Sequence, residues 1–226
     1  MMILHSTAAS PFVRKVRMAV RLLGLDDRIS ERETDLNDPA DPIRRQNPLG
    51  KIPALTREDG STLFDSRVIL DYLDHLAGGG RIVPRDPEAR FSALTLQALC
   101  DGALDASVLI VYEARYRSPE MRVQAWIDRQ ADKVARTLAA LETQAPPLSG
   151  VPHVGQIALA CLLGYRDFRF DGSWRQTYRA CMRGTTHSPR RCRPSPRPRP
   201  SSKRERKSPG ANSGAFQFHA RCDQNL

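Results

Sequence analysis

The stretch Asn47-Pro48-Leu49-Gly50-Lys51-Ile52-Pro53-Ala54-Leu55 decides how the first part of this chain folds. It joins a Gly-Lys turn to an Ile-Pro step, which opens a short apolar run. An X-Pro bond adopts the cis form at modest cost and keeps it in tight turns, and a proline at the start of a strand removes no central ladder hydrogen bond. The stretch therefore predicts a strand that Pro53 begins, with the main chain of Ile52 left as a free edge for an extended peptide.

The residues before this stretch predict a strand, a helix and a second strand. Ser10 followed by Pro11 marks the helix start, because serine caps a helix and proline suits its first turn. Apolar residues at helical spacing follow, and Gly24 ends the helix. The first strand is expected at Met2–His5 and the second within Ile29–Thr34. The basic residues of the helix are expected on its polar faces: Arg14, Lys15, Arg17 and Arg21.

The residues after it complete a β-α-β-α-β-β-α unit. Asp38 to Gln46 forms at best a short helix, and a second short run at Leu63-Phe64 follows a charged hairpin turn. Asp65-Ser66 opens the next helix as a capping signature, and three glycines at 78–80 close the unit.

Long helices are predicted for the second half of the chain. Asp86-Pro87 starts one that runs to about Arg117, and Ser118-Pro119 starts the next by the same cap-then-proline rule. A third helix begins at His153, where Gln156 can reach back to a backbone N–H but histidine is a poor cap.

The net charge of +10 is not evenly distributed along the chain. Residues 176–226 hold twelve Lys and Arg against two Asp and Glu, so residues 1–175 are neutral. The N-terminus lacks the pattern of a cleavable signal, and no run is expected to approach the ~18–20 apolar residues of a membrane helix. The five cysteines form no CxxC or metal-ligand spacing, which argues against a disulfide framework and a zinc site. A reduced, cytoplasmic protein is expected.

Three segments together resemble the glutathione S-transferase family: Ser10–Arg17, Asn47–Leu55 and Leu63–Leu70. The resemblance implies an α/β thioredoxin-like domain over residues 1–80, followed by an all-α helical domain over residues 86–175. The helical domain is shorter than the family pattern, which stops near Trp174, and an Arg/Pro-rich tail over residues 176–226 is expected to be disordered.

Ser10 is the candidate catalytic residue that this resemblance implies. Its matching position activates or bonds glutathione in the serine- and cysteine-type enzymes. A helix N-terminus favours an anion and lowers a thiol pKa, although the same serine can act simply as a helix cap. Ser6 and Thr7 are the alternatives. No cysteine precedes residue 100, so any sulfur chemistry in this domain needs a ligand that brings the sulfur.

The remaining glutathione-binding residues follow from the same resemblance. The main chain of Ile52, held by Pro53, would pair with the cysteinyl unit. Ser66 would receive the γ-glutamyl carboxylate at a helix N-terminus, and Asp65 would lie near the γ-glutamyl ammonium. Lys51 is a candidate for the glycyl carboxylate, although turn lysines are often simply solvated.

The resemblance also implies a substrate and a partner. Phe12, Tyr112 and Tyr116 are candidates for lining the pocket of a small electrophile, and a homodimer would form through the first long helix. The expected function is transfer of glutathione to that electrophile, as in detoxification, without a metal. The alternative is a non-catalytic protein that keeps the fold for binding.

The tail permits two interpretations. Its abrupt change to Arg, Pro and Ser is typical of GC-rich DNA read in a shifted frame, which translation of the other two frames past codon 175 would test. The rival is a basic arm that binds nucleic acid or anionic surfaces non-specifically by counterion release.

Overall fold

The computed structural model describes residues 1–144 and 150–179. The chain separates into two units, Met1–Pro189 and Arg190–Leu226, and every described residue lies in the first. The hypotheses about the tail concern residues that lie, from 180 onward, outside the described part. The expected division of the first unit at residues 80 and 86 stays a prediction.

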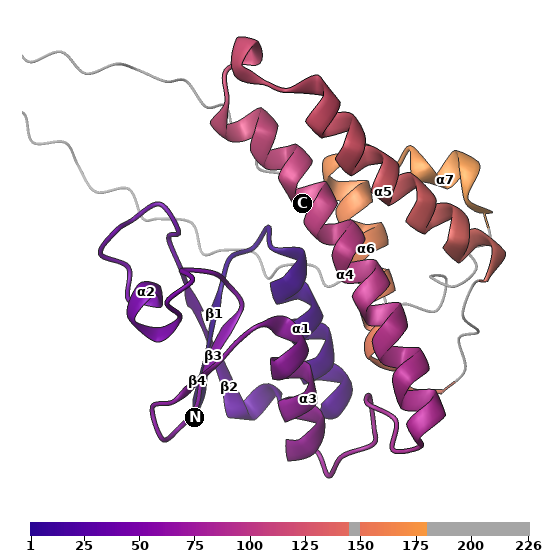
Figure 1. The fold of residues 1–226 in the computed structure, drawn as a ribbon. Coiled ribbons are helices and arrows are strands. Elements are labelled where there is room, and N and C mark those ends of the chain that lie inside the picture. Colours follow the sequence, from indigo (N-terminus) through magenta and orange to yellow (C-terminus); the bar gives the residue numbers. More distant parts are fainter. Residues whose placement is uncertain (145–149, 180–226) are drawn as a thin grey trace, which may run out of the picture. The chain divides into compact units, whose positions relative to one another are not determined.

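The first half of the described chain contains a four-stranded sheet (Figure 1). Its order is β2-β1-β3-β4, with β1 parallel to β2 and antiparallel to β3, and β3 antiparallel to β4. The predicted β-α-β-α-β-β-α order is confirmed. The bounds are β1 Met2–Ser6, α1 Pro11–Leu23, β2 Ile29–Glu33, α2 Ile43–Gln46, β3 Ala54–Thr56, β4 Thr62–Leu63 and α3 Ser66–Leu76, with a 3-10 turn at Asp26–Arg28.

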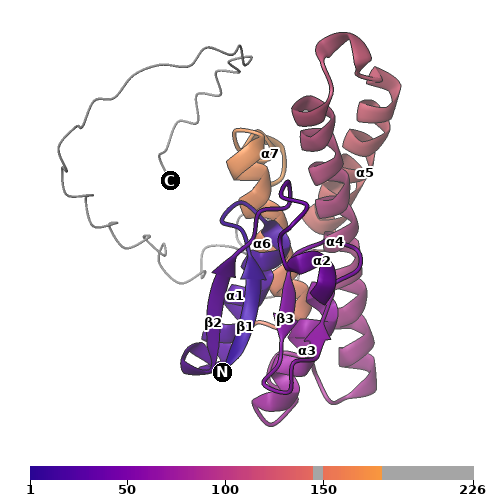
Figure 2. The ribbon, with the colours of Figure 1, turned by 90° about the vertical axis from the view of Figure 1, so that its left-hand side faces the viewer.

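Helices α1 and α3 cover one face of this sheet (Figure 2). Ser10 caps α1, and Gly24 ends it in the left-handed conformation at φ 70°, which glycine adopts without steric cost. The buried faces of both helices pack on the sheet because their apolar residues recur at helical spacing. The core they share contains Leu4, Val13, Val16, Leu55, Ile69 and Leu73.

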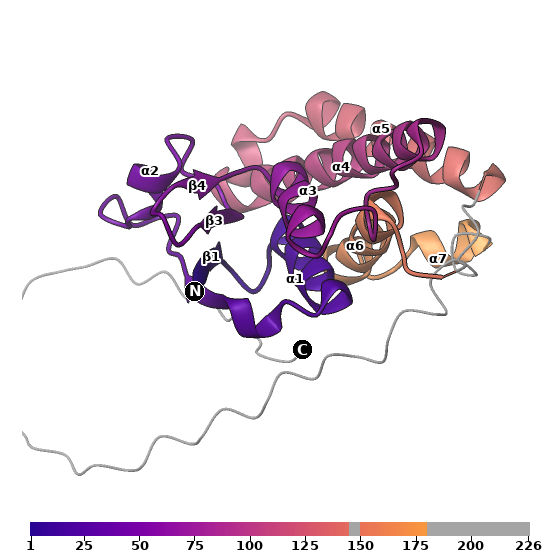
Figure 3. The same cartoon turned by 90° about the horizontal axis from the view of Figure 1, so that it is seen from below.

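The second half of the described chain is helical (Figure 3). Its helices are α4 Pro87–Tyr116, α5 Gln124–Thr143, α6 Val154–Arg169 and α7 Trp174–Thr177. Helix α4 packs on both α5 and α6, and α6 also contacts α1. A second core joins α4, α5 and α6. It contains Cys100, Leu104, Leu138, Ala158 and Leu162.

The prediction that a long helix starts at Ser118 is wrong. Pro119–Met121 forms only a 3-10 turn, and α5 begins at Gln124. The Ser118 hydroxyl donates to the Glu120 side chain rather than capping a backbone N–H. Glu113 of α4 accepts instead from the backbone N–H of Val123, at 3.1 Å, so the segment is tied to α4 before the helix starts.

Helix α4 is long and apolar enough to cross a membrane by length and composition alone. The expectation that no run approaches this length is therefore wrong for α4. Part of the helix is buried against α5 and α6, and a buried core helix passes the same test.

The expectation that His153 caps α6 poorly is also corrected. Its Nδ1 accepts from the backbone N–H of Gly155 at 3.2 Å, and the Gln156 side chain accepts from the backbone N–H of His153 at 2.9 Å. A complete capping box results, but it requires Nδ1 to be unprotonated.

This cap predicts a stability that depends on pH. Burial lowers the pKa of His153 below its ordinary 6.5, so the unfolded chain binds this proton more readily than the folded one. The contribution is complete above pH 6.5 and is lost as pH falls through the lowered pKa. An H153N variant, which caps without titrating, should keep about 0.5–2 kcal/mol that the native chain loses at pH 5. Urea unfolding at pH 5 and pH 8 measures this, and equal acid losses in both proteins would contradict it.

Candidate active site

The sheet brings the three predicted glutathione-binding segments to one end of its strands. Because β1 and β3 are antiparallel with His5 opposite Ala54, the chain leaves β1 toward Ser10 where Pro53 enters β3. Strand β4 pairs Leu63 with Leu55, so it also ends at this end of the sheet, just before α3. The starts of α1 and α3 and the entry to β3 therefore lie at the same end of the sheet.

Ser10 is the N-cap of α1. Its Oγ accepts from the backbone N–H of Val13 at 3.2 Å, and the residue is half-buried. The cap uses a lone pair of the hydroxyl oxygen, and the hydroxyl hydrogen serves a separate partner. Capping and donation to an anion at this helix N-terminus are therefore compatible.

The alternative residue Ser6 is occupied by a structural contact. Its hydroxyl donates to Glu31 Oε2 at 3.0 Å, and Arg17 Nη2 donates to the same oxygen at 2.6 Å. The hydrogen bond from Arg17 lowers the pKa of Glu31, so this acceptor stays ionised and holds the Ser6 hydrogen. Ser6 joins β1 to β2 and has no hydrogen left for a thiolate.

The loop before β3 is shaped by Asn47, which the sequence did not single out. This buried side chain donates to the Lys51 carbonyl at 2.8 Å and accepts from the backbone N–H of Leu49 at 3.0 Å. The Ile52–Pro53 bond is cis, as the stretch predicts. Pairing with β1 begins at Ala54, so Ile52 precedes the paired segment, and Lys51 is exposed.

Asp65 and Ser66 form the start of α3. The Asp65 carboxylate accepts from the backbone N–H of Arg67 at 2.9 Å, which makes it the N-cap. The bond between Phe64 and Asp65 is also cis. Ser66 is buried, and its Oγ accepts from Lys15 Nζ at 3.1 Å.

Lys15 corrects the expectation that it lies on a polar face of α1. It is fully buried, and its Nζ donates to both Asp101 oxygens, at 2.7 Å and 2.8 Å, as well as to Ser66. A signal was present in the sequence: Lys15 follows Phe12 by three residues and precedes Ala19 by four, which places it beside the apolar stripe.

Asp101 of α4 completes this buried cluster. Its side chain is 2% exposed, and Arg67 Nε lies 3.4 Å from its Oδ2. Burial raises the pKa of Asp101, and the Lys15 ammonium opposes that rise. The sequence reasoning missed Asp101, although it and Asp105 are the charged residues between Arg90 and Glu113 in an otherwise uncharged stretch of helix.

Comparisons with known proteins match both halves of the chain. Residues 4–81 match the glutathione S-transferase N-terminal domain, and residues 124–183 match the C-terminal domain. An uncharacterised GST-like protein of Escherichia coli K12, YibF, is 31% identical over 164 residues, which span 71% of this chain and 79% of that protein. The chain belongs to the glutathione S-transferase family.

Solved glutathione S-transferase structures resemble the chain over most of its length. A glutathione transferase family member from Pseudomonas fluorescens Pf-5, crystallised with bound glutathione, is 40% identical with a TM-score of 0.74, covering 82% of this chain and 95% of that one. A glutathione S-transferase from Methylobacillus flagellatus KT with glutathione bound is 35% identical with a TM-score of 0.76, covering 81% and 92%. The predicted family and fold class are confirmed.

The residues predicted to line a substrate pocket are spread over two elements of this glutathione S-transferase fold. Phe12 of α1 is half-buried against the helical core, with Lys15 Nζ 5.9 Å from its ring centroid. Tyr112 and Tyr116 of α4 are exposed and stack edge to face, with ring centroids 5.3 Å apart. Their role in binding an electrophile stays a prediction.

His5 is packed inside the protein. It is buried in β1, its Nε2 lies 3.1 Å from Thr56 Oγ1, and burial lowers its pKa. Within residues 1–144 and 150–179, no group of three His, Cys, Asp or Glu side chains is arranged to hold a metal ion.

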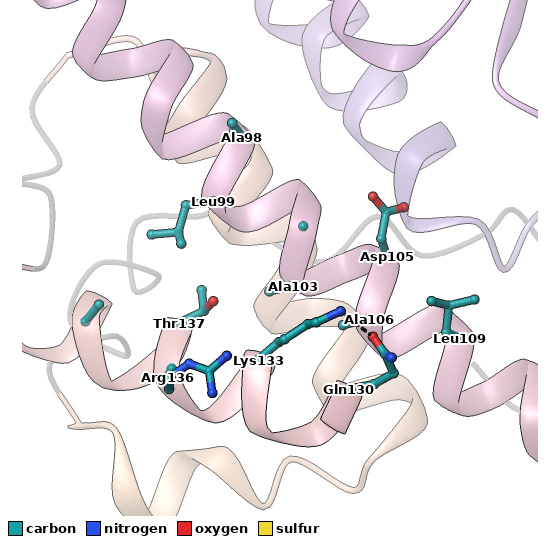
Figure 4. A pocket seen from close by; sticks show the side chains of 12 residues that line it. Ala98, Leu99, Ala103, Asp105, Ala106, Leu109, Gln130, Lys133, Arg136 and Thr137 are labelled. Atoms are coloured by element: carbon teal, nitrogen blue, oxygen red, sulfur yellow. Dashed lines mark hydrogen bonds between the residues drawn. The ribbon is translucent and has the colours of Figure 1, made fainter. Parts of the chain in front are cut away.

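A groove of about 540 Å³ lies elsewhere, between α4 and α5 (Figure 4). Lys133 and Gln130 both belong to α5, and Lys133 Nζ donates to Gln130 Oε1 at 3.0 Å. The exposed Leu99 and Leu109 also line it, whereas none of the predicted site residues does. The groove therefore contains no predicted site residue of this glutathione S-transferase fold, and Asp105, one turn of α4 from Asp101, lines it.

Proposed function

We propose that this protein is a glutathione transferase, which binds glutathione at the sheet edge and transfers it to a small electrophile. The observation that carries the proposal is that α1 and α3 start at the same end of the sheet as the entry to β3, and that Lys15 of α1 donates to Ser66 at the start of α3. Relatives 35–40% identical to this chain were crystallised with glutathione bound. Two helix N-termini supply donors for anions, and a strand edge between them suits a short extended peptide.

The proposed roles follow this geometry. The main chain of Ile52, held by Pro53, pairs with the cysteinyl unit. Ser66 donates to the γ-glutamyl carboxylate, and Asp65 lies near the γ-glutamyl ammonium. Lys51, which is exposed, is within the same loop and suits the glycyl carboxylate.

Ser10 is the proposed catalytic residue. Its hydroxyl donates to the glutathione sulfur, and the N-terminus of α1 adds its positive field, so the thiol proton leaves to solvent at a lower pH. The thiolate then attacks the electrophile: a carbon–sulfur bond forms, and the leaving group departs with its electron pair. Phe12, Tyr112 and Tyr116 are proposed to contact the electrophile.

The first test is whether the purified chain binds glutathione at all. Retention on glutathione-agarose and elution by free glutathione are expected, followed by conjugation of a nitroaryl chloride as the probe electrophile. Retention without turnover of any electrophile would favour the non-catalytic binding protein. Failure to bind S-methylglutathione, measured by calorimetry on folded protein, would exclude both.

A homodimer through α4 is part of the proposal. The groove between α4 and α5 exposes Leu99 and Leu109 at 39% each, and a second copy of the chain would bury them. Light scattering of the purified protein should give the mass of two chains, and Leu99→Arg should shift it to one, because it places a charge in an apolar contact. A monomeric native chain at micromolar concentration would contradict this part.

We also propose that this glutathione transferase is located in the cytoplasm and has a role in detoxification. Cys100 and Cys161 are buried thiols, and burial raises the pKa of the Cys161 thiol to about 12. Such thiols are inert packing groups, which suits a reducing compartment and leaves glutathione as the reactive sulfur.

A further inference from the structure

A lysine with no exposed surface lies directly behind the start of α3. Lys15 Nζ has three hydrogens, and three acceptors surround it: Asp101 Oδ1 at 2.7 Å, Asp101 Oδ2 at 2.8 Å and Ser66 Oγ at 3.1 Å. These groups come from three different helices, α1, α3 and α4. Burying a lysine and an aspartate is costly, so this cluster calls for a reason beyond filling space.

The ammonium fixes the direction of the Ser66 hydrogen bond. Lysine is only a donor, so Ser66 Oγ must accept from Lys15, and its own hydrogen must go to a different acceptor. Among residues 1–144 and 150–179, the hydrogen bonds recorded for Ser66 Oγ include no acceptor for that hydrogen. The hydroxyl is therefore held as a donor at a helix N-terminus, where an anion is favoured.

Lys15 also sets the local charge. Asp101 is paired with Lys15 and lies 3.4 Å from Arg67, which in turn lies 3.6 Å from the capping carboxylate of Asp65. These two cations and two anions balance. Asp105, one turn further along α4, adds another negative charge. Burial, and then repulsion by Asp101, raises the pKa of Asp105. Loss of Lys15 would leave excess negative charge where the ligand carboxylate is expected.

We propose that Lys15 is a positioning residue that makes Ser66 selective for the γ-glutamyl α-carboxylate, acting through Ser66 and Asp101 without touching the ligand. This inference rests on the proposed glutathione site. It assigns to the buried ion pair a role in ligand recognition that is distinct from thiolate formation at Ser10.

The test compares two ligands that differ only at this carboxylate. The probes are S-methylglutathione and the same molecule with its γ-glutamyl α-carboxylate converted to an amide, titrated into the full chain by calorimetry. The native protein should prefer the carboxylate, and Ser66→Ala should reduce that preference by about tenfold, the value of one charge-assisted hydrogen bond. Amidation of the glycyl carboxylate is the matched ligand control.

The decisive variant is Lys15→Met/Asp101→Leu, because replacement of a buried ion pair by apolar residues commonly leaves a protein folded. It should lose the preference for the carboxylate by about tenfold, with no further loss when Ser66→Ala is added, since the two act through one hydrogen bond. Asp101→Asn, of native size, is the second variant and should lose part of the preference. Arg129→Met removes an exposed guanidinium from α5, outside the residues that line the α4–α5 groove, and should leave the ratio unchanged.

The outcomes separate the two proposals. An unchanged ratio in both Lys15→Met/Asp101→Leu and Asp101→Asn overturns the role of Lys15 while the glutathione site stands. Equal weakening of both ligands shows a merely structural role and overturns it as well. No binding of S-methylglutathione by the native chain overturns the site and this inference together.

Discussion

Ser10→Ala is expected to lower kcat/KM for glutathione conjugation by about 10- to 150-fold, which corresponds to a hydrogen bond of about 1.5–3 kcal/mol to a charged group. The physical reason is that the Ser10 hydroxyl has a hydrogen available beyond its cap to Val13. Loss of this donor disfavours the thiolate, so the thiol pKa rises and the pH profile of kcat/KM moves up by about one to two units. Initial rates from pH 5.5 to 9 measure both effects.

The control must separate catalysis from the loss of a helix cap. Asp86→Ala removes the N-cap of α4, whose carboxylate accepts from the backbone N–H of Ala89 at 2.8 Å. It should cost a similar 0.5–2 kcal/mol of stability, roughly, as any cap does, with kcat/KM unchanged. Full activity in Ser10→Ala would remove Ser10 from the mechanism and favour Thr7, because the Ser6 hydrogen is already donated to Glu31.

The order of elements in residues 1–80 was predictable because local signals mark nearly every boundary. Ser10 before Pro11, Gly24 and Asp65 act within a few residues of their own positions, and each forms the cap that its residue type favours. The start of α5 was missed because two local signals compete. Ser118 carries a cap signature, but Glu113 in the last turn of α4 accepts from the backbone N–H of Val123, ten residues further along, and Pro119–Met121 between them forms a 3-10 turn.

The candidate site was predictable where a short motif determines the local backbone conformation. The Ile52–Pro53 stretch gives its own cis bond and strand entry, and strand pairing then carries the helix starts to the same edge. The buried cluster was not predictable, because Lys15 and Asp101 are separated by 86 residues and a lone lysine in an amphipathic helix is usually solvated. Only helical phase, together with two isolated acids in an apolar helix, hinted at it.

Lys15→Met is expected to destabilise the protein by about 3–5 kcal/mol, the usual cost of removing one partner from a buried ion pair. Asp101 would keep its burial but lose both short contacts to Nζ, and Arg67, half-exposed with its Nε 3.4 Å away, would be its remaining cation. Urea unfolding at pH 7.5 gives the free energy of unfolding. Arg129→Met, which removes an exposed charge outside the α4–α5 groove, serves as the surface control and should stay within about 0.5 kcal/mol of the native value.

The deficit of Lys15→Met should shrink as pH falls, which identifies its cause. Burial already raises the pKa of Asp101 against the opposing charge of Lys15, so removing that charge raises the pKa further. The folded variant then binds a proton more readily than the unfolded chain, and its stability recovers relative to the native protein as pH falls through the raised pKa. Lys15→Met/Asp101→Leu, which has no buried carboxylate, should be more stable than Lys15→Met at pH 7.5 and show no such recovery. A deficit that is equal at pH 5 and pH 7.5 would instead mean that Lys15 stabilises the fold through packing of its aliphatic stem.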